Sequence, residues 1–193
     1  MKETKVIISF SSCGRKYFSN NHPDDISILN APCSDFIITK RKRTEEELEE
    51  KRKEWDETPH LLSGEGYIDR IRDNTIMVKT PEYPNNYLQY ISEHIGKVDY
   101  ILTTASDDIK KKLIEMGIRP ILVYPDKSLK EEWIGRMFLA GNREPVLKTF
   151  AENWDKWIDA MQKFGKEYDL DEYVLEHNGY LSDVINILHS FHS

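Results

Sequence analysis

Five short apolar runs separated by helical patterns constrain the fold more than any other feature of the chain. These runs are rich in β-branched and aromatic residues, as buried strands are, and they lie at residues 5–10, 26–29, 98–105, 119–125 and 172–178. Strands that alternate with helices in this way predict an α/β domain with a mainly parallel sheet. A chain of 193 residues is long enough for one such domain with an insertion.

The helical segments between these runs carry recognisable start and stop signals. Ser106 is expected to cap a helix that opens with two aspartates, and Pro84 stands near the start of a helix that Gly96 ends. Ser128 followed by Glu131 has the spacing of a capping box. Further helices are expected over residues 14–20, 145–164 and 180–191.

A charge-rich block at residues 37–80 interrupts the alternation of strands and helices. Thr44 is placed to cap a helix that opens with three glutamates, and Glu49 and Lys53 are spaced to pair on its surface. Residues 75–79 are expected to form a small extra strand. We interpret the block as an insertion into a single domain spanning residues 1–193, with the role of a lid, a pocket wall or a docking surface.

Charge and composition limit the partners. The net charge of −7 argues against binding of long nucleic acid, so an anionic ligand must be held by a local basic pocket. The early apolar run is too short for a signal peptide or a membrane span. Neither the two cysteines nor the six histidines form a metal or catalytic pattern. We therefore expect a cytoplasmic protein with no membrane partner, no metal and no cofactor.

Ligands of parallel α/β sheets bind beyond the carboxyl ends of the strands. The loops expected there are residues 11–16, 30–35, 103–106 and 124–127. Every loop on that rim follows a strand, so the convergence of these four loops indicates where a site would lie without showing that one exists.

The first of these loops has part of a phosphate-binding pattern. Such loops read GxxxxGK[ST], in which glycines let backbone N–H groups surround the phosphates and the hydroxyl binds magnesium. Here Gly14 is followed by Arg15 and Lys16, and the first glycine is absent. An ammonium group cannot bind magnesium, so the residues alone leave two interpretations open, a plain strand–turn–helix and a loop that contacts phosphate.

Two other features also have a structural and a functional interpretation. Arg136 lies on a helix that ends near Gly141, and it either reaches a phosphate or is solvated or paired with a glutamate. Trp154 and Trp157 follow helical spacing, which favours core packing over stacking on a base.

Six longer motifs resemble a known family when they are taken together and in order. They are "FSSCGRKYF", "NAPCSDF", "YPNNYLQYI", "GKVDYILTTA", "LVYPDKSLKEEWIGRMFLAGN" and "GYLSDVI". Their order and content resemble phage-encoded P-loop nucleotide kinases of the deoxynucleoside monophosphate kinase type. The resemblance covers nearly all of the chain except residues 37–80. It implies a three-layer P-loop kinase-like domain with a helical insertion.

The chain departs from the family's pattern at its catalytic positions. In the loop, Ser11 and Ser12 replace a proline and a glycine, Arg15 replaces the lysine, and Lys16 replaces the magnesium-binding hydroxyl. Elsewhere the replacements for two acidic residues, a histidine and a second lid arginine are Asn30, Pro32, Ala105 and Ala140. Losing one transition-state contact typically costs roughly 10²–10³ in rate. The resemblance therefore implies a kinase scaffold without catalytic residues.

The ligand site implied by the resemblance is the former active site. Its members are Ser11, Ser12, Cys13, Gly14, Arg15, Lys16, Tyr17, Ser34, Phe36, Tyr83, Asn86, Tyr87, Thr104 and Arg136. Cations among them would contact phosphates, and aromatic side chains would stack on a base. The expected ligand is a nucleotide or a nucleotide-derived molecule. The specific hypothesis is sequestration of an immune signal, either a cyclic dinucleotide or an ADP-ribose derivative.

Two alternatives remain beside this hypothesis. The chain could be an active nucleoside monophosphate kinase with an atypical loop, or a protein-interaction module whose pocket is empty. Assembly into a homo-oligomer, in which subunits cover each other's pockets, is a further expectation.

Overall fold

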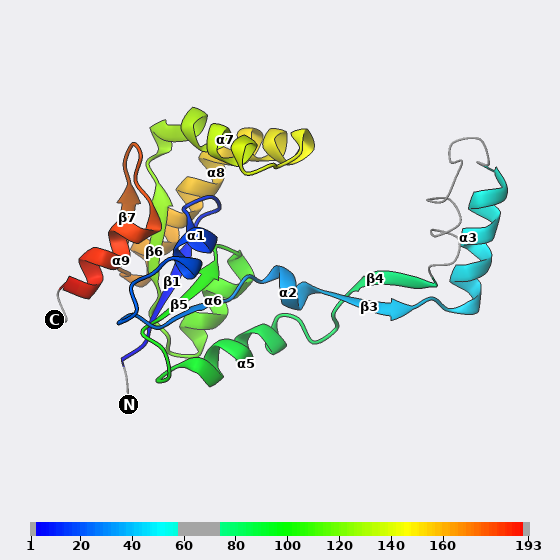
Figure 1. Ribbon diagram of the computed structural model, residues 1–193, viewed down its shortest axis with the longest axis horizontal. Coiled ribbons are helices and arrows are strands. Elements are labelled where there is room, and N and C mark those ends of the chain that lie inside the picture. Colours follow the sequence, from blue (N-terminus) through cyan, green and yellow to red (C-terminus); the bar gives the residue numbers. More distant parts are fainter. Residues whose placement is uncertain (1–2, 58–73, 191–193) are drawn as a thin grey trace. The chain divides into compact units, whose positions relative to one another are not determined.

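The computed structural model describes residues 3–57 and 74–190, which form two compact units (Figure 1). The first unit comprises Met1–Cys33 and Pro84–Ser193, and the second comprises Ser34–Tyr83. The expected insertion at residues 37–80 lies within the second unit.

A five-stranded parallel sheet organises the first unit, in the order β2-β5-β1-β6-β7. The expected α/β fold with a parallel sheet is thereby confirmed. Each strand overlaps one of the five apolar runs, and the bounds are β1 Lys5–Ser9, β2 Ile28–Asn30, β5 Tyr100–Thr104, β6 Ile121–Pro125 and β7 Glu172–Leu175.

Helices cover both faces of this sheet (Figure 1). The connections β1–β2 and β5–β6 run in opposite directions along the sheet, and right-handed crossovers then place their helices on opposite faces. Accordingly α1 packs against α9, whereas α5 packs against α6. The bounds are α1 Arg15–Asn20, α5 Asn85–His94, α6 Asp107–Glu115, α7 Lys130–Leu139, α8 Glu144–Tyr168 and α9 Leu181–Ser190.

The core combines fully buried aliphatic strands with an aromatic cluster at the carboxyl edge of the sheet. Phe10 packs edge-on against Trp154 at 5.6 Å between ring centroids, and Trp154 lies 6.3 Å from Trp133. Trp133 and Trp154 are fully buried, which confirms the core interpretation of Trp154. Trp157, for which core packing was also expected, is only half-buried. The cluster joins β1 to α7 and α8, so it fixes these helices beside the loop that follows β1.

The expected capping box at Ser128 is wrong. A short 3₁₀ helix, Lys127–Leu129, precedes α7, and the residue that caps it is Asp126. The backbone N–H and the hydroxyl of Ser128 both donate to Asp126 Oδ1, at 2.9 and 2.6 Å. The carboxylate that directly follows β6 thus accepts these bonds, and Ser128 becomes a donor within the turn.

The second unit contains an antiparallel strand pair and a capped helix. The capping box joins Thr44 and Glu47, since Thr44 N donates to Glu47 Oε2 at 2.8 Å and Glu47 N donates to Thr44 Oγ1 at 3.3 Å. Glu49 and Lys53 pair at 3.8 Å, as expected. The strand at 75–79 is confirmed, but its partner β3 was not predicted. The bounds are α2 Ser34–Ile37, β3 Ile38–Lys42, α3 Glu45–Glu57 and β4 Thr75–Lys79.

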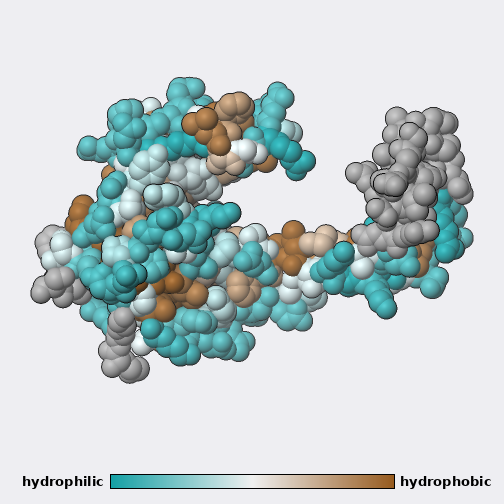
Figure 2. Space-filling view, viewed as in Figure 1, coloured by the Kyte–Doolittle hydropathy of each residue, from teal (hydrophilic) through white to brown (hydrophobic). Residues whose placement is uncertain are grey.

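An exposed apolar region lies at the end of α7, where Phe138 and Leu139 face solvent (Figure 2). Two adjacent apolar side chains are too small a surface to indicate a partner by themselves. Over residues 3–57 and 74–190, no helix has the length and apolarity that crossing a membrane requires.

Candidate functional site

The loop between β1 and α1 lies at the switch point of the sheet. The connection from β1 leads to β2 on one side, whereas its neighbour β6 leads to β7 on the other side. Ligands of open α/β sheets bind in the crevice where adjacent strands lead in opposite directions, beyond their carboxyl ends. The topology therefore favours the loop at residues 10–14 as one wall of a binding site.

Two neighbouring helices hold this loop by its carbonyl groups. Trp133 Nε1 of α7 donates to Ser11 O at 2.9 Å, and Leu181 N of α9 donates to Cys13 O at 2.8 Å. Gly14 has a φ of 90°, and a Cβ added there would lie 3.1 Å from Tyr180 Cδ1. The loop is thus fixed from two sides and closely packed at its glycine.

Several backbone N–H groups of the loop have no hydrogen-bond acceptor among the described residues. Those of Ser12, Cys13 and Gly14 donate to no residue in the described part of the chain. Arg15 and Lys16 begin α1, where helices leave N–H groups without internal partners. Left-handed φ values at Ser12 and Gly14 give the loop the mixed handedness of backbone nests that bind anions. A phosphate needs donors of this kind.

The Arg15 side chain turns toward the end of β5. Its Nη1 donates to Thr103 O at 2.9 Å, and burial lowers the pKa of the guanidinium, offset in part by Tyr87, Cys33 and Cys13 nearby. A hydrogen bond to a backbone carbonyl makes Arg15 a brace between α1 and β5. The predicted role in holding phosphate would require its remaining N–H groups.

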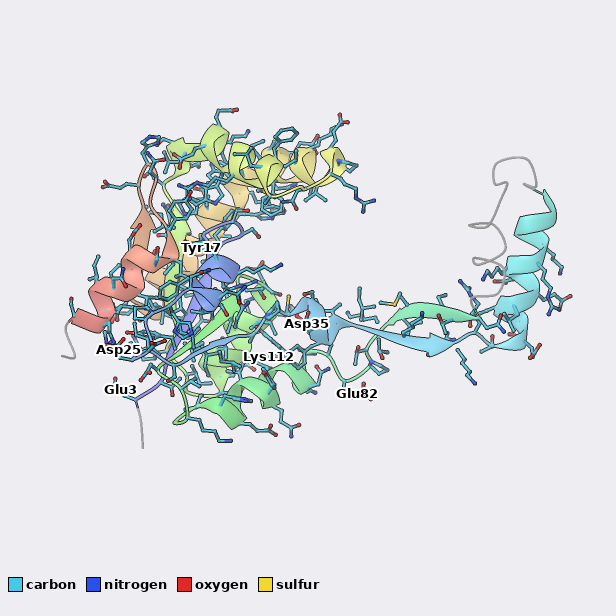
Figure 3. The ribbon with its side chains drawn as sticks, viewed as in Figure 1. Glu3, Tyr17, Asp25, Asp35, Glu82 and Lys112 are labelled. Atoms are coloured by element: carbon cyan, nitrogen blue, oxygen red, sulfur yellow. The ribbon has the colours of Figure 1, made fainter. Side chains whose placement is uncertain are left out.

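Lys16 and Tyr17 lie on the exposed side of α1. Tyr17 is 72% exposed, and Figure 3 shows its position on this helix. Lys16 is exposed as well. Both residues sit at the rim of the predicted site, and Lys16 is an exposed cation two residues after Gly14.

Cys13 is not a nucleophile in this structure. Its thiol is buried, and burial raises its pKa to about 12. The thiol is therefore protonated at neutral pH, and only the thiolate reacts.

Tyr87 and its neighbours connect α5 to the carboxyl edge of the sheet. The Tyr87 hydroxyl donates to Ala31 O at 2.5 Å, and burial raises the pKa of this fully buried side chain. Asn86 Oδ1 accepts from Tyr87 N at 2.7 Å, and Thr104 lies beside the hydroxyl at the end of β5. A ring enclosed in this way is packed in the core, so it presents no face on which a base could stack.

Three predicted site residues belong to the second unit. Ser34 donates to Asp35 Oδ1 at 3.1 Å, and Phe36 and Tyr83 are half-buried. Their participation in a ligand site stays a prediction.

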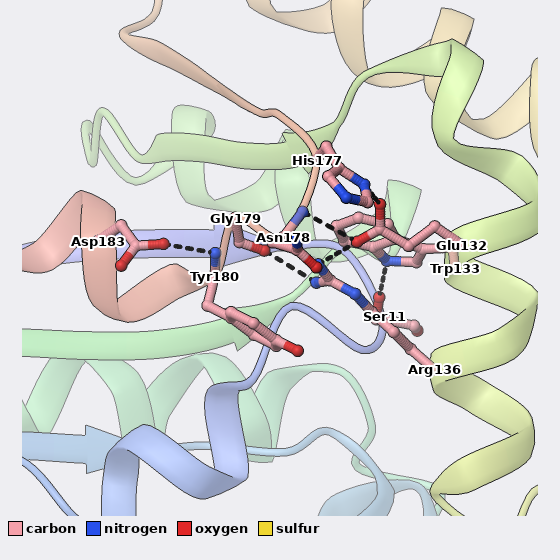
Figure 4. A network of polar contacts seen from close by, with 9 residues as sticks. All are labelled: Ser11, Glu132, Trp133, Arg136, His177, Asn178, Gly179, Tyr180 and Asp183. Carbon is pink, nitrogen blue, oxygen red and sulfur yellow. Dashed lines mark hydrogen bonds and ion pairs between the residues drawn. The ribbon is translucent and has the colours of Figure 1, made fainter.

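Arg136 lies in a network that joins α7 to the β7–α9 turn (Figure 4). Its guanidinium lies between two aromatic rings, 4.0 Å from the Trp133 centroid and 4.2 Å from that of Tyr180. It donates to Gly179 O at 2.8 Å and pairs with Glu132. The Arg136 side chain is only 11% exposed. Of the two interpretations, contact with a phosphate and pairing with a glutamate, the structure shows the second.

Glu132 is the centre of this network and gives a prediction about pH. Burial raises the pKa of Glu132, but hydrogen bonds from His177, the Asn178 N–H and Arg136 outweigh burial, so its pKa lies below the usual 4.5. A lowered folded-state pKa adds stability above pH 4.5 that is lost as the pH falls through the folded pKa.

We expect Glu132→Gln to be less stable than the wild type at pH 7, and the difference to narrow below about pH 4. Urea unfolding of both proteins at pH 7 and pH 3.5 measures this difference. The other carboxylates are the same in both proteins, so their effects on stability cancel in the comparison. An equal difference at both pH values would contradict the prediction.

A cavity of about 430 Å³ lies beside the loop, on the α6 and α8 side of the sheet. Ser11 belongs to both the loop and the cavity wall, which also includes four other residues of the predicted rim loops. The lining consists of Phe10, Ser11, Cys33, Thr104, Ala105, Ser106, Asp107, Lys110, Phe150, Trp157, Ala160 and Met161.

Lys110 is a charged residue of this wall that sequence patterns did not predict to be part of a site. Only 2% of it is exposed, and its ammonium lies 2.8 Å from Asp107 Oδ1 and 5.1 Å from the Phe164 ring centroid. The sequence has three consecutive lysines at 110–112, a pattern that indicates a solvated helix face and so gives no sign that Lys110 is buried. The signal was the spacing of Lys110 three residues before the buried Leu113, which places both on one side of α6.

No cluster of three or more potential metal ligands occurs among the residues that the structure describes. No protein-family model matches the chain, and no curated protein sequence matches it.

Proposed function

We propose that the chain binds a nucleotide or a nucleotide-derived molecule at the carboxyl edge of β1 and β5 and does not transfer its phosphate. The observation that carries the proposal is that the β1–α1 loop and the cavity meet at Ser11. On one side of Ser11 lies a braced loop with available backbone N–H groups, and on the other lies a cavity large enough for a ligand. A ligand with an anionic group on the loop and a ring in the cavity would have the two parts of a nucleotide, its phosphate and its base.

The side chains of the loop support binding more than catalysis. Phosphoryl transfer depends on magnesium and on positioned cations. Lys16 occupies the position expected for the magnesium-binding hydroxyl, and Arg15 is engaged with Thr103 O. Arg136 is held by Glu132 and Gly179 O. The scaffold is accordingly proposed to be a P-loop kinase-like domain whose site holds ligands without turnover.

Calorimetry with a nucleotide panel tests this proposal. The panel contains nucleoside mono-, di- and triphosphates, cyclic dinucleotides and ADP-ribose, the last two because they represent the signals that a sequestering protein would bind. We expect binding without magnesium and no release of ADP from ATP in a coupled assay. A ligand at 100 times its Kd should raise the free energy of unfolding by about 2.7 kcal/mol.

Two results would redirect the interpretation. Magnesium-dependent phosphoryl transfer that Arg15→Ala abolishes would establish a kinase. Failure of every nucleotide to bind or stabilise the protein would leave the interaction module as the better hypothesis.

A further inference from the structure

Aromatic side chains form the walls of the cavity. Phe10 follows β1, and Phe150 and Trp157 come from α8. Their rings pack edge-to-face, with centroids 6.1 Å apart for Phe10 and Phe150 and 4.8 Å apart for Phe150 and Trp157. Aromatic walls of this kind favour a planar ring as the occupant.

The polar end of the cavity places a donor beside an acceptor. The Lys110 side chain is buried at the wall, where its charge is costly without a partner, and Asp107, whose own side chain is 76% exposed, supplies that partner. The ammonium has three donors, and its contact beside that with Asp107 is a weak one to Met161 Sδ at 3.7 Å. A carboxylate accepts up to about four hydrogen bonds, so Asp107 keeps capacity after pairing with Lys110.

We propose that this cavity is a guanine-binding subsite, with Lys110 donating to O6 and the Asp107 carboxylate accepting from N1–H and the 2-amino group. The inference rests on the proposed function, since it places the base of the nucleotide whose phosphate lies on the β1–α1 loop. Guanine carries an acceptor directly beside two donors along one edge, which matches the order of ammonium and carboxylate. Adenine presents a 6-amino donor to the ammonium and the N1 lone pair to the carboxylate, so both contacts become repulsive.

Titrations with guanosine, adenosine and inosine test the cavity separately from the loop, because nucleosides carry no phosphate. Guanosine should bind roughly 5- to 150-fold more tightly than adenosine, which is the discrimination expected from one bidentate contact. Inosine lacks the 2-amino group and should fall between them. Pyrophosphate, which has no base, tests the loop alone.

Asp107→Asn should shift the preference of the cavity from guanosine to xanthosine. An amide donates to the 2-oxo group of xanthine, so guanosine binding should weaken by a similar factor and xanthosine should become the better ligand. Asp108→Asn is the matched control, because Asp108 lies in the same first turn of α6 and is absent from the cavity wall. It removes the same charge and should leave guanosine binding unchanged.

A second variant guards against loss of folding. Asp107→Asn leaves the buried Lys110 without its carboxylate, whereas the double variant Asp107→Asn/Lys110→Met removes both charges and keeps the apolar stem. A folded double variant should bind guanosine and adenosine equally well.

The outcomes separate the two proposals. Equal affinity of the wild type for guanosine and adenosine, or a guanosine affinity that Asp107→Asn does not change, overturns the guanine subsite and leaves nucleotide binding standing. Guanosine binding without any pyrophosphate or nucleotide binding preserves the subsite and overturns the phosphate loop. Absence of binding by every compound overturns both.

Discussion

Replacing Trp133 with alanine should lower the free energy of unfolding by about 3–5 kcal/mol. The indole is fully buried, and its Nε1 donates to Ser11 O. The same ring supports the Arg136 guanidinium at 4.0 Å. Alanine would therefore leave a large cavity, an unpaired Ser11 carbonyl and an arginine with one aromatic neighbour removed. Urea unfolding followed by circular dichroism measures the change.

Trp133→Phe separates packing from the hydrogen bond. Phenylalanine keeps an aromatic ring near Arg136 but cannot donate to Ser11 O, and it should cost less than alanine. If the loop depends on that bond, Trp133→Phe should also weaken pyrophosphate binding. A loss below about 1 kcal/mol for Trp133→Ala would contradict the packing described for this residue.

Gly14→Ala should destabilise the protein by about 1–3 kcal/mol and weaken ligand binding. With φ at 90°, Gly14 adopts a backbone conformation that side-chain-bearing residues occupy at a cost. The new methyl group would also lie 3.1 Å from Tyr180 Cδ1, so the loop or the ring must move. Since the available N–H groups surround this residue, pyrophosphate titration should report the shift together with thermal unfolding.

Gly135→Ala is the control for this prediction. Gly135 lies within α7, and a Cβ added there meets nothing within 4 Å. The same substitution should therefore stabilise the helix by roughly 0.5–1 kcal/mol and leave binding unchanged. A loss of stability at Gly135 equal to that at Gly14 would show that the φ of Gly14 does not explain its effect.

The central fold was predictable because its strands are short, apolar and bounded by turn residues. The runs around Ile7, Ile101 and Leu122 are buried by the sheet and its helices, and burial requires the composition that marks them. β3 gave no such signal, since all five of its residues are exposed and three of them are charged. A strand whose stability comes from pairing with β4 carries little information in its own hydropathy.

The site was harder to predict because side-chain partners are a tertiary property. The sequence marks Gly14 and Arg15 as loop residues, but the bond from Arg15 to Thr103 O depends on how β5 lies beside β1. Likewise, Lys110 differs from Lys111 and Lys112 only in facing α8. Periodicity places a residue on a helix face, whereas the distant segment that packs there decides its role.

The strand order has a consequence for synthesis of the chain on the ribosome. β1 pairs only with β5 and β6 among the described strands, and β2 pairs with β5. None of the main sheet can therefore form before Tyr100 and its neighbours emerge, whereas the β3–β4 pair is complete by Lys79. Until β5 has emerged, the apolar β1 segment has no strand to pair with and is prone to aggregation. A chaperone would therefore protect the chain most while only its amino-terminal half has been synthesised.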